Sequence, residues 1–373
     1  MKILFTGGGT GGHFYPIIAV AKEIRRVAKE NKMVQPTLLY FAPDPYIEQM
    51  LYDNQISFSR VSSGKVRAYS SILNFFDMFK TFFGVIGALW KVFWSYPDVI
   101  FSKGGYGSFP VVFAGRMLGI PIIIHESDSV PGKVNRWAGK FAKRIAISYP
   151  DAAAYFPKDK TAWTGNPVRP EIEMASKEGA KEFLNLKENI PTLLILGGSQ
   201  GAKLINDIIL DALPKLIEKF QIIHQTGINN FKEVNNTAKS ILIHSDYKDR
   251  YMAFQYLDDL AMKMSAGAAD LIITRAGSAI FEIASWGIPS IIIPITESNG
   301  NHQRLNAYTY ARTGAGIVIE EKNLSDDILM AQISKIMDND AVYQQMAESS
   351  KNFAKPNADR EIAEEIIRFG LHN

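Results

Sequence analysis

The stretch that decides the fold of this chain is KILFTGGGTGGH, residues 2–13. An apolar run followed by glycines and a helical pattern predicts a β-strand, a tight turn and a helix N-terminus. The glycines let backbone N–H groups approach an anion, and the helix N-terminus adds partial positive charge. The layout recurs at residues 192–201, which read TLLILGGSQG. The chain is therefore expected to contain two nucleotide-binding α/β domains that face one cleft.

The composition is that of an ordinary globular protein and excludes several classes of function. The 373 residues are enough for roughly two to three domains. A net charge of +3 is too balanced to indicate a partner nucleic acid. The chain has no cysteine, which excludes disulfides and thiolate metal sites. The N-terminus starts with the strand and the glycines and lacks a signal-peptide pattern, so we expect a cytosolic protein.

Short apolar runs alternate with longer helical patterns along the chain, which is typical of βαβ units and parallel sheets. The expected strands are residues 2–6, 37–42, 98–102, 121–125 and 144–148, then 192–196, 221–225, 252–255, 270–274 and 290–294. Glycine and proline interrupt the pattern at 164–167. We therefore expect an N-terminal Rossmann-like domain over 1–164 and a C-terminal one over 165–355. A last helix, about 357–373, is expected to return to the first domain.

A dinucleotide-binding oxidoreductase is the first alternative, because Gly7, Gly9 and Gly12 satisfy the G-x-G-x-x-G spacing. That function needs an acidic residue about 20 positions later to bind a ribose. The best candidate, Asp44, comes later and precedes Pro45. Two glycine-rich turns in two halves instead favour a site that brings a nucleotide-activated donor to an acceptor.

Further motifs follow in a fixed order along the chain. They are GGTGGH at 8–13, GGY at 104–106, HE at 125–126, PG at 131–132, NR at 135–136, TGNPVR at 164–169, GGSQGA at 197–202, HQ at 302–303 and NA at 306–307. In this order they closely resemble the MurG family of bacterial glycosyltransferases, from residue 1 to about residue 320. The resemblance implies the two-domain GT-B fold.

The resemblance also implies a function in peptidoglycan synthesis. It implies an inverting transfer of N-acetylglucosamine from UDP-N-acetylglucosamine to the C4 hydroxyl of undecaprenyl-pyrophosphoryl-N-acetylmuramoyl-pentapeptide, which converts lipid I to lipid II. No cofactor and no strict metal requirement are expected, and the partners are the two substrates and a cell-wall synthesis complex. The alternatives are another UDP-sugar enzyme of this fold, such as a lipid glycosyltransferase or a UDP-N-acetylglucosamine 2-epimerase, and a nucleotide-sugar-binding regulator without activity.

Donor-site residues follow from the resemblance. Ser199 and Gln200 are expected near the diphosphate with Arg169, and Glu282 on the ribose. A ribose diol suits a carboxylate acceptor, and sugar hydroxyls suit amides that both donate and accept hydrogen bonds. The remaining donor-site candidates are Thr10, Gly11, Gly12, Asn135, Leu257, His302, Gln303 and Asn306.

Catalytic and acceptor residues are expected in the first domain. A neutral His13 could take the proton of the acceptor hydroxyl, or it could be a helix-capping or anion-binding histidine. His125 and Glu126 end a strand. They are expected either to orient the acceptor or only to pack at the strand end, and Glu126 is the second catalytic candidate. Gly104 and Gly105, with Tyr106, are expected to bind the acceptor pyrophosphate or to form a structural turn.

The segment Ile72–Trp94 is the most aromatic of the chain, with polar residues at a helical period. It is too charged to span a bilayer. Its tryptophans and phenylalanines, with Lys65 and Arg67 nearby, suit docking on an anionic membrane surface, and the alternative is a buried core helix. We therefore expect a peripheral protein on the cytoplasmic face of the bacterial plasma membrane.

Three departures from the family pattern are present; one of them, His302 where some members have Gln, is also a familiar form, and the other two affect the site. Ser127 and Asp128 stand where the family usually has Gln and Asn after His-Glu. The segment before Glu282 is one residue shorter than usual. We expect both to alter local contacts, the first with the acceptor and the second with the donor sugar.

Overall fold

The structure is a computed structural model that describes residues 1–64, 72–198, 201–296 and 301–371, with residues 72–76 described by their backbone alone. The chain forms two compact units. The first contains Met1–Arg169 and Lys355–Asn373, and the second contains Pro170–Ala354. The division lies five residues after the predicted one, so residues 165–169 belong to the first unit.

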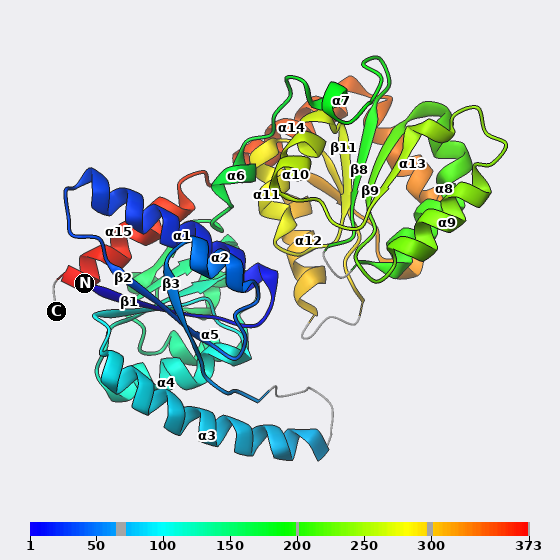
Figure 1. Ribbon diagram of the computed structural model, residues 1–373. Coiled ribbons are helices and arrows are strands. Elements are labelled where there is room, and N and C mark those ends of the chain that lie inside the picture. The colour runs from blue at the N-terminus through cyan, green and yellow to red at the C-terminus, as the bar shows by residue number, and fades with distance from the viewer. Residues whose placement is uncertain (65–71, 199–200, 297–300, 372–373) are drawn as a thin grey trace. The chain divides into compact units, whose positions relative to one another are not determined.

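The first unit is built on a parallel sheet in the order β3-β2-β1-β4-β5-β6-β7. Helices α1 and α15 cover one of its faces, and α3 and α4 cover the other (Figure 1). Its strands are β1 (Lys2–Thr6), β2 (Thr37–Ala42), β3 (Ile56–Arg60), β4 (Val99–Ser102), β5 (Ile122–Glu126), β6 (Arg144–Ile147) and β7 (Thr161–Trp163). Its helices are α1 (Gly11–Glu30), α2 (Glu48–Asp53), α3 (Ile72–Ser95), α4 (Phe109–Met117), α5 (Lys133–Ala138) and α15 (Ala358–Leu371).

Alternating side chains of β1 fill two separate cores. Ile3 and Phe5 are buried with α1 and α15 on one face of the sheet, whereas Leu4 is buried with α3 and α4 on the other. This is the period of two that a strand covered on both faces requires. The returning helix α15 is fixed to α1 by an ion pair between Arg360 and Glu30 at 2.9 Å.

The second unit repeats the architecture with a parallel sheet in the order β10-β9-β8-β11-β12-β13. Its strands are β8 (Thr192–Leu196), β9 (Gln221–Gln225), β10 (Tyr251–Phe254), β11 (Leu271–Thr274), β12 (Ser290–Ile292) and β13 (Gly316–Val318). Its helices are α6 (Pro170–Glu173), α7 (Ala180–Phe183), α8 (Lys203–Lys219), α9 (Phe231–Ile241), α10 (Asp259–Ala268), α11 (Ala279–Trp286), α12 (His302–Arg312), α13 (Asp326–Met337) and α14 (Asp340–Phe353).

Candidate active site

Each sheet has one point at which the strand order reverses, and the glycine-rich turns follow the strands at that point. In the first unit the point lies between β1 and β4, and in the second between β8 and β11. Ligands of open parallel sheets bind outside the carboxyl ends of the strands at such a point. The two turns that the sequence singled out, residues 7–12 and 197–201, therefore mark one candidate site in each unit.

In the first unit, the turns after β1 and β4 contact each other so closely that only glycine fits. Gly104 and Gly105 have φ of 81° and 79°, which side chains other than glycine rarely adopt. A Cβ on Gly105 would lie 3.0 Å from the Cα of Gly8, and one on Gly104 would lie 2.5 Å from Nδ2 of Asn135. The two turns and α5, which carries Asn135, thus form one continuous surface of backbone at the sheet edge.

His13 lies in the first turn of α1 beside this surface. Its Nδ1 is 2.8 Å from Oγ1 of Thr10. Burial lowers the pKa of His13 to about 4, and the positive charge of Lys103 adds to that effect while Asp128 opposes it. The imidazole is therefore neutral at physiological pH, which a proton acceptor requires.

The end of β5 is organised by a buried lysine. Nζ of Lys103 is 2.5 Å from Nδ1 of His125 and 3.0 Å from Oδ1 of Asn166, and it also donates to Oγ of Ser127. Nε2 of His125 lies 2.9 Å from the carbonyl oxygen of Gly165. Sequence reasoning missed Lys103, although the signal was present: it is a single charged residue between a buried strand and two glycines.

The carboxylate of Glu126 is buried and fully engaged. One oxygen accepts from the backbone N–H of Asp128 at 3.0 Å, and the other accepts from the N–H of Gly132 at 3.2 Å and from Nδ2 of Asn135 at 2.9 Å. Burial raises the pKa of Glu126 to about 7, with the charge of Asp128 adding to it. The side chain thus closes the loop between β5 and α5.

Arg169 and Tyr106 also lie in the first unit. The guanidinium of Arg169 stacks over the ring of Tyr15 in α1, 4.3 Å from its centroid. The backbone carbonyl of Tyr106 accepts a hydrogen bond from Ser63 at 2.7 Å. The resemblance implied a place for Arg169 at the donor diphosphate, and the predicted boundary put it in the C-terminal domain, whereas it is the last residue of the first stretch of the first unit.

In the second unit, two predicted amides hold the loops at the sheet edge. Oε1 of Gln303 accepts from the backbone N–H of Ile295, beyond β12, at 3.2 Å. Nδ2 of Asn306 donates to the carbonyl of Ala276, beyond β11, at 3.4 Å. Asn306 is buried, and His302, which begins α12, is partly exposed.

Of the other predicted donor residues, Thr10, Gly11, Gly12 and Asn135 lie in the first unit, and the rest lie in the second unit or outside the described residues. Glu282 is partly exposed in the first turn of α11, and Gly287 ends that helix in the left-handed conformation with φ of 67°. Leu257 is buried and its N–H donates to Gln225 at 3.1 Å. Ser199 and Gln200 lie outside the described residues, as do Lys65 and Arg67.

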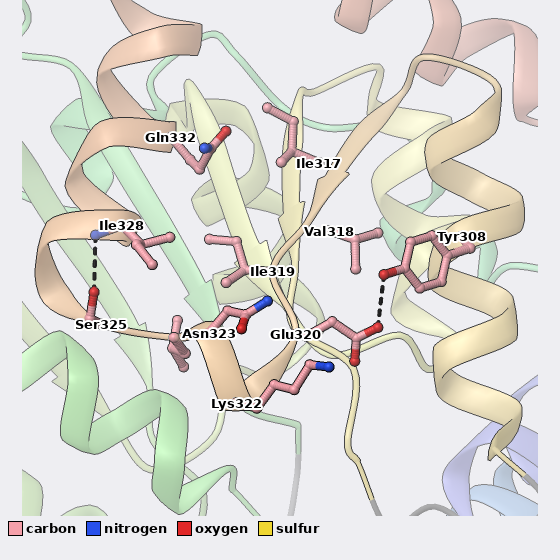
Figure 2. A pocket seen from close by; sticks show the side chains of 11 residues that line it. Tyr308, Ile317, Val318, Ile319, Glu320, Lys322, Asn323, Ser325, Ile328 and Gln332 are labelled. Atoms are coloured by element: carbon pink, nitrogen blue, oxygen red, sulfur yellow. Dashed lines mark hydrogen bonds between the residues drawn. The ribbon is translucent and has the colours of Figure 1, made fainter.

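A cavity of about 650 Å³ in the second unit lies apart from these residues (Figure 2). It is bounded by β13, by Tyr308 of α12, and by Ser325, Ile328 and Gln332 at the start of α13 and within it. At its margin Tyr308 donates to Glu320 at 2.8 Å. None of the sequence-predicted donor residues lines it, so it is not the predicted donor site.

Helix α3 packs on α4 along one side and carries apolar side chains on the other. Ala88 and Val92 are fully buried, whereas Phe82 is 60% and Trp90 66% exposed. The further exposed apolar side chains of the helix are Met78, Phe79, Phe83, Ile86, Phe93 and Trp94. The helix thus presents an apolar face, which we call the α3 face. Among the described residues, none of the helices is both long and apolar enough to cross a bilayer.

Across the part of the chain that the structure describes, no three His, Asp or Glu side chains gather in a group that could hold a metal ion.

Comparisons with known proteins agree with this architecture. The model of the glycosyltransferase family 28 N-terminal domain matches residues 3–147, and that of the C-terminal domain of the same family matches residues 192–365. A Clostridium botulinum (strain Loch Maree / Type A3) protein named UDP-N-acetylglucosamine--N-acetylmuramyl-(pentapeptide) pyrophosphoryl-undecaprenol N-acetylglucosamine transferase is 34% identical over 345 residues, 92% of each chain.

Solved structures show the same fold. The crystal structure of Acinetobacter baumannii MurG superposes with a TM-score of 0.74 at 25% identity, covering 98% of this chain and 99% of that one. A UDP-GlcNAc 2-epimerase from Neisseria meningitidis bound to UDP-GlcNAc gives 0.68 at 16% identity, covering 99% and 100%. The second likeness establishes fold alone. The predicted α/β fold class, two Rossmann-like domains of the GT-B type, is confirmed.

Proposed function

This chain belongs to the MurG family of family 28 glycosyltransferases, and we propose that it transfers N-acetylglucosamine from UDP-N-acetylglucosamine to the C4 hydroxyl of lipid I, forming lipid II. The observation that carries the proposal is the sequence relationship at 34% identity over 92% of the chain, which includes both units. The epimerase shares only the fold at 16% identity. Fold likeness without sequence likeness does not transfer an activity.

The acceptor side of the reaction falls to the first unit. The lowered pKa of His13 leaves its ring neutral. When Nδ1–H donates to Thr10, Nε2 keeps a lone pair that can accept the proton of the attacking hydroxyl. The backbone N–H groups of Gly8 and Gly105 would bind the pyrophosphate of the lipid-linked acceptor, whereas the N–H of Gly104 donates to Oγ of Ser102 at 3.2 Å.

Glu126 orders this site instead of moving a proton. Its two oxygens already accept three hydrogen bonds from the loop that follows β5 and from Asn135. A carboxylate so engaged fixes the loop between His125 and α5, which keeps the acceptor-binding surface in one shape.

The donor side of the reaction falls to the second unit. The turn after β8 leads to α8, whose N-terminus begins at Lys203 and favours an anion. Glu282 would accept from the ribose hydroxyls, and Arg169 would face the diphosphate. As the sugar leaves UDP, the growing charge on the diphosphate would be stabilised by backbone N–H groups, the helix dipole and Arg169.

The α3 face would attach the protein to the cytoplasmic side of the membrane that holds the acceptor. An amphipathic helix with phenylalanine and tryptophan on one side lies in the headgroup region without spanning it. Reversible attachment of this kind brings a soluble nucleotide sugar and a polyprenyl-linked acceptor to the same enzyme.

A transfer assay with radiolabelled UDP-N-acetylglucosamine and a lipid I analogue tests the function. We expect label in the lipid product, also in EDTA. Release of UDP with formation of N-acetylmannosamine would instead support an epimerase, and binding without turnover would support a regulator. UDP-N-acetylglucosamine should also raise the melting temperature, because a ligand of the native state stabilises it; stabilisation by NADH alone would contradict the donor assignment.

A further inference from the structure

Lys103 occupies an unusual place for a lysine. It follows β4 directly, is 1% exposed, and its Cβ would lie 3.4 Å from a Cβ built on Gly7 in the first glycine-rich turn. Lysine is almost never fully buried unless its charge is paired. The contacts of its ammonium group must therefore account for the burial of Lys103.

The ammonium has three donors, and the structure gives it three acceptors. They come from His125 at the end of β5, Ser127 in the next loop and Asn166 in the segment after β7. These acceptors are 22, 24 and 63 residues away along the chain. One side chain thus joins the end of β4 to two other segments, residues 125–127 and the segment with Asn166.

The same contacts decide the protonation of His125. The carbonyl oxygen of Gly165 can only accept, so Nε2 of His125 carries the hydrogen in the contact of 2.9 Å. In the neutral ring Nδ1 then has the lone pair, and it accepts from Lys103 at 2.5 Å. Burial and the charge of Lys103 hold the pKa of His125 well below its usual range, in agreement with a neutral ring.

Charged groups face Lys103 from the elements around it. Burial lowers the pKa of Lys103, whereas the carboxylates of Glu126, on β5, and Asp128, in the following loop, raise it. On the other side, burial and then the charge of Lys103 lower the pKa of His13, from α1. The charge on Lys103 is thus favoured by two carboxylates, and it disfavours protonation of two histidines that burial already keeps neutral.

We propose that Lys103 is a positioning residue of the acceptor-side site: its ammonium fixes His125 in the Nε2–H tautomer and holds the loop after β5 against Asn166. The inference rests on the proposed function for its effect on transfer, but the arrangement of hydrogen bonds can be tested without it. Lys103 itself has no donor left for substrate.

The structural test is NMR of the full chain with ¹⁵N-labelled histidine. In the wild type, His125 should show a protonated Nε2 and a hydrogen-bonded Nδ1. In Lys103→Met, the titrations of His13 and His125 should move to higher pH, because a neighbouring cation is gone. Lys140→Met, which removes an exposed lysine of the same unit, should change neither. A wild-type His125 protonated at Nδ1 would overturn the inference even if Lys103→Met failed to fold.

The functional test separates positioning from binding. Lys103→Met should lower kcat on the order of 10- to 100-fold, as misplaced catalytic groups do. The KM for UDP-N-acetylglucosamine should stay within about twofold, and the acidic limb of the rate profile should move to higher pH. A folded Lys103→Met variant in which the titration of His125 is unchanged would by itself overturn the inference. Absence of transfer by the wild type would end the proposed function, and the NMR result would still decide the role of Lys103.

Discussion

His13 owes its predicted role to its surroundings more than to its residue type. An ordinary histidine has a pKa near 6.5 and is partly charged at neutral pH. In this structure burial, and then the charge of Lys103, lower the pKa of His13 to about 4, and Thr10 holds Nδ1 at 2.8 Å. One orientation and one charge state are thereby selected from the several that a surface histidine would sample.

We expect His13→Gln to lower kcat by about 100-fold or more, which is the range for a lost general base. The Kd for UDP-N-acetylglucosamine should change little, because the proposed partner of His13 is the acceptor hydroxyl. Steady-state kinetics together with calorimetric titration of the donor would measure both. His244→Gln, at an exposed histidine of the second unit, is the matched control. A variant at position 13 with near-normal kcat would remove this residue from the base role.

Glu282 provides the opposite kinetic pattern. Its carboxylate lies in the first turn of α11 and is partly exposed, so a ribose diol could reach it. Glu282→Ala should weaken donor binding by about 10-fold or more, the cost of one or two hydrogen bonds to a charged group, while association with lipid vesicles is unchanged. Glu218→Ala, at an exposed carboxylate on α8, should leave the donor Kd as it was. If both variants bind UDP-N-acetylglucosamine equally well, Glu282 is only a surface carboxylate and does not contact the donor.

At the scale of elements, the sequence predicted long apolar runs well and short edge strands poorly. Strands β1, β2, β8 and β9 have the predicted bounds. The sequence argument missed β3, whose Ser57 and Ser59 interrupt the apolar run at the sheet edge, and the three-residue strands β7 and β13. Such strands are defined by hydrogen bonds to a neighbour, which local composition does not record.

At the candidate site too, local sequence requirements could be predicted but contacts between distant residues could not. The glycine-rich turns were visible because a positive φ or a close approach requires glycine locally. The contact between Lys103 and Asn166 was not, since it joins residues 63 positions apart that only the sheet order brings together.

The exposed α3 face leads to a prediction about membrane attachment. Phe82→Ser with Trp90→Ser should reduce sedimentation with anionic vesicles, because the apolar face enters the headgroup region, while transfer to a short-chain soluble acceptor persists. Both side chains are more than half exposed, so the fold should survive. Val34→Ser with Tyr52→Ser, at 88% and 78% exposed positions of the same unit, is the matched control. Unfolding of the α3 variant would mean that the helix face is core.

The two units share one architecture but differ in the position of their buried polar side chains. In the first unit, Lys103, His125 and Glu126 lie together at the carboxyl edge of the sheet. The second buries His224 within β9, where Nε2 lies 3.0 Å from Oδ1 of Asn206 and Nδ1 lies 2.9 Å from the hydroxyl of Tyr251. Because an amide oxygen only accepts, Nε2 carries the hydrogen and Nδ1 accepts from tyrosine, so each nitrogen of a neutral ring has a partner.

This neutral histidine should make the stability of the whole protein sensitive to acid. Burial lowers the pKa of His224 to about 3. The unfolded chain binds this proton near pH 6.5, whereas the folded state binds it only near pH 3. The free energy of unfolding is therefore highest above pH 6.5 as far as this group is concerned, and it decreases as the pH falls toward 3. At about 1.4 kcal/mol per pH unit, the loss between pH 6.5 and 4.5 is about 2 to 3 kcal/mol.

Substitution of His224 should therefore flatten the acid dependence of unfolding. His224→Gln removes the titration, so its stability deficit relative to the wild type should shrink by about 2 to 3 kcal/mol between pH 6.5 and 4.5. Urea unfolding followed in the transition of the second unit would measure the difference. His244→Gln, at an exposed histidine of the same unit, should give a curve parallel to the wild type. Parallel curves for His224→Gln as well would mean that the folded state binds this proton over the same pH range as the unfolded chain; Nδ1 would then donate to the hydroxyl of Tyr251, while Nε2 would still donate to Asn206.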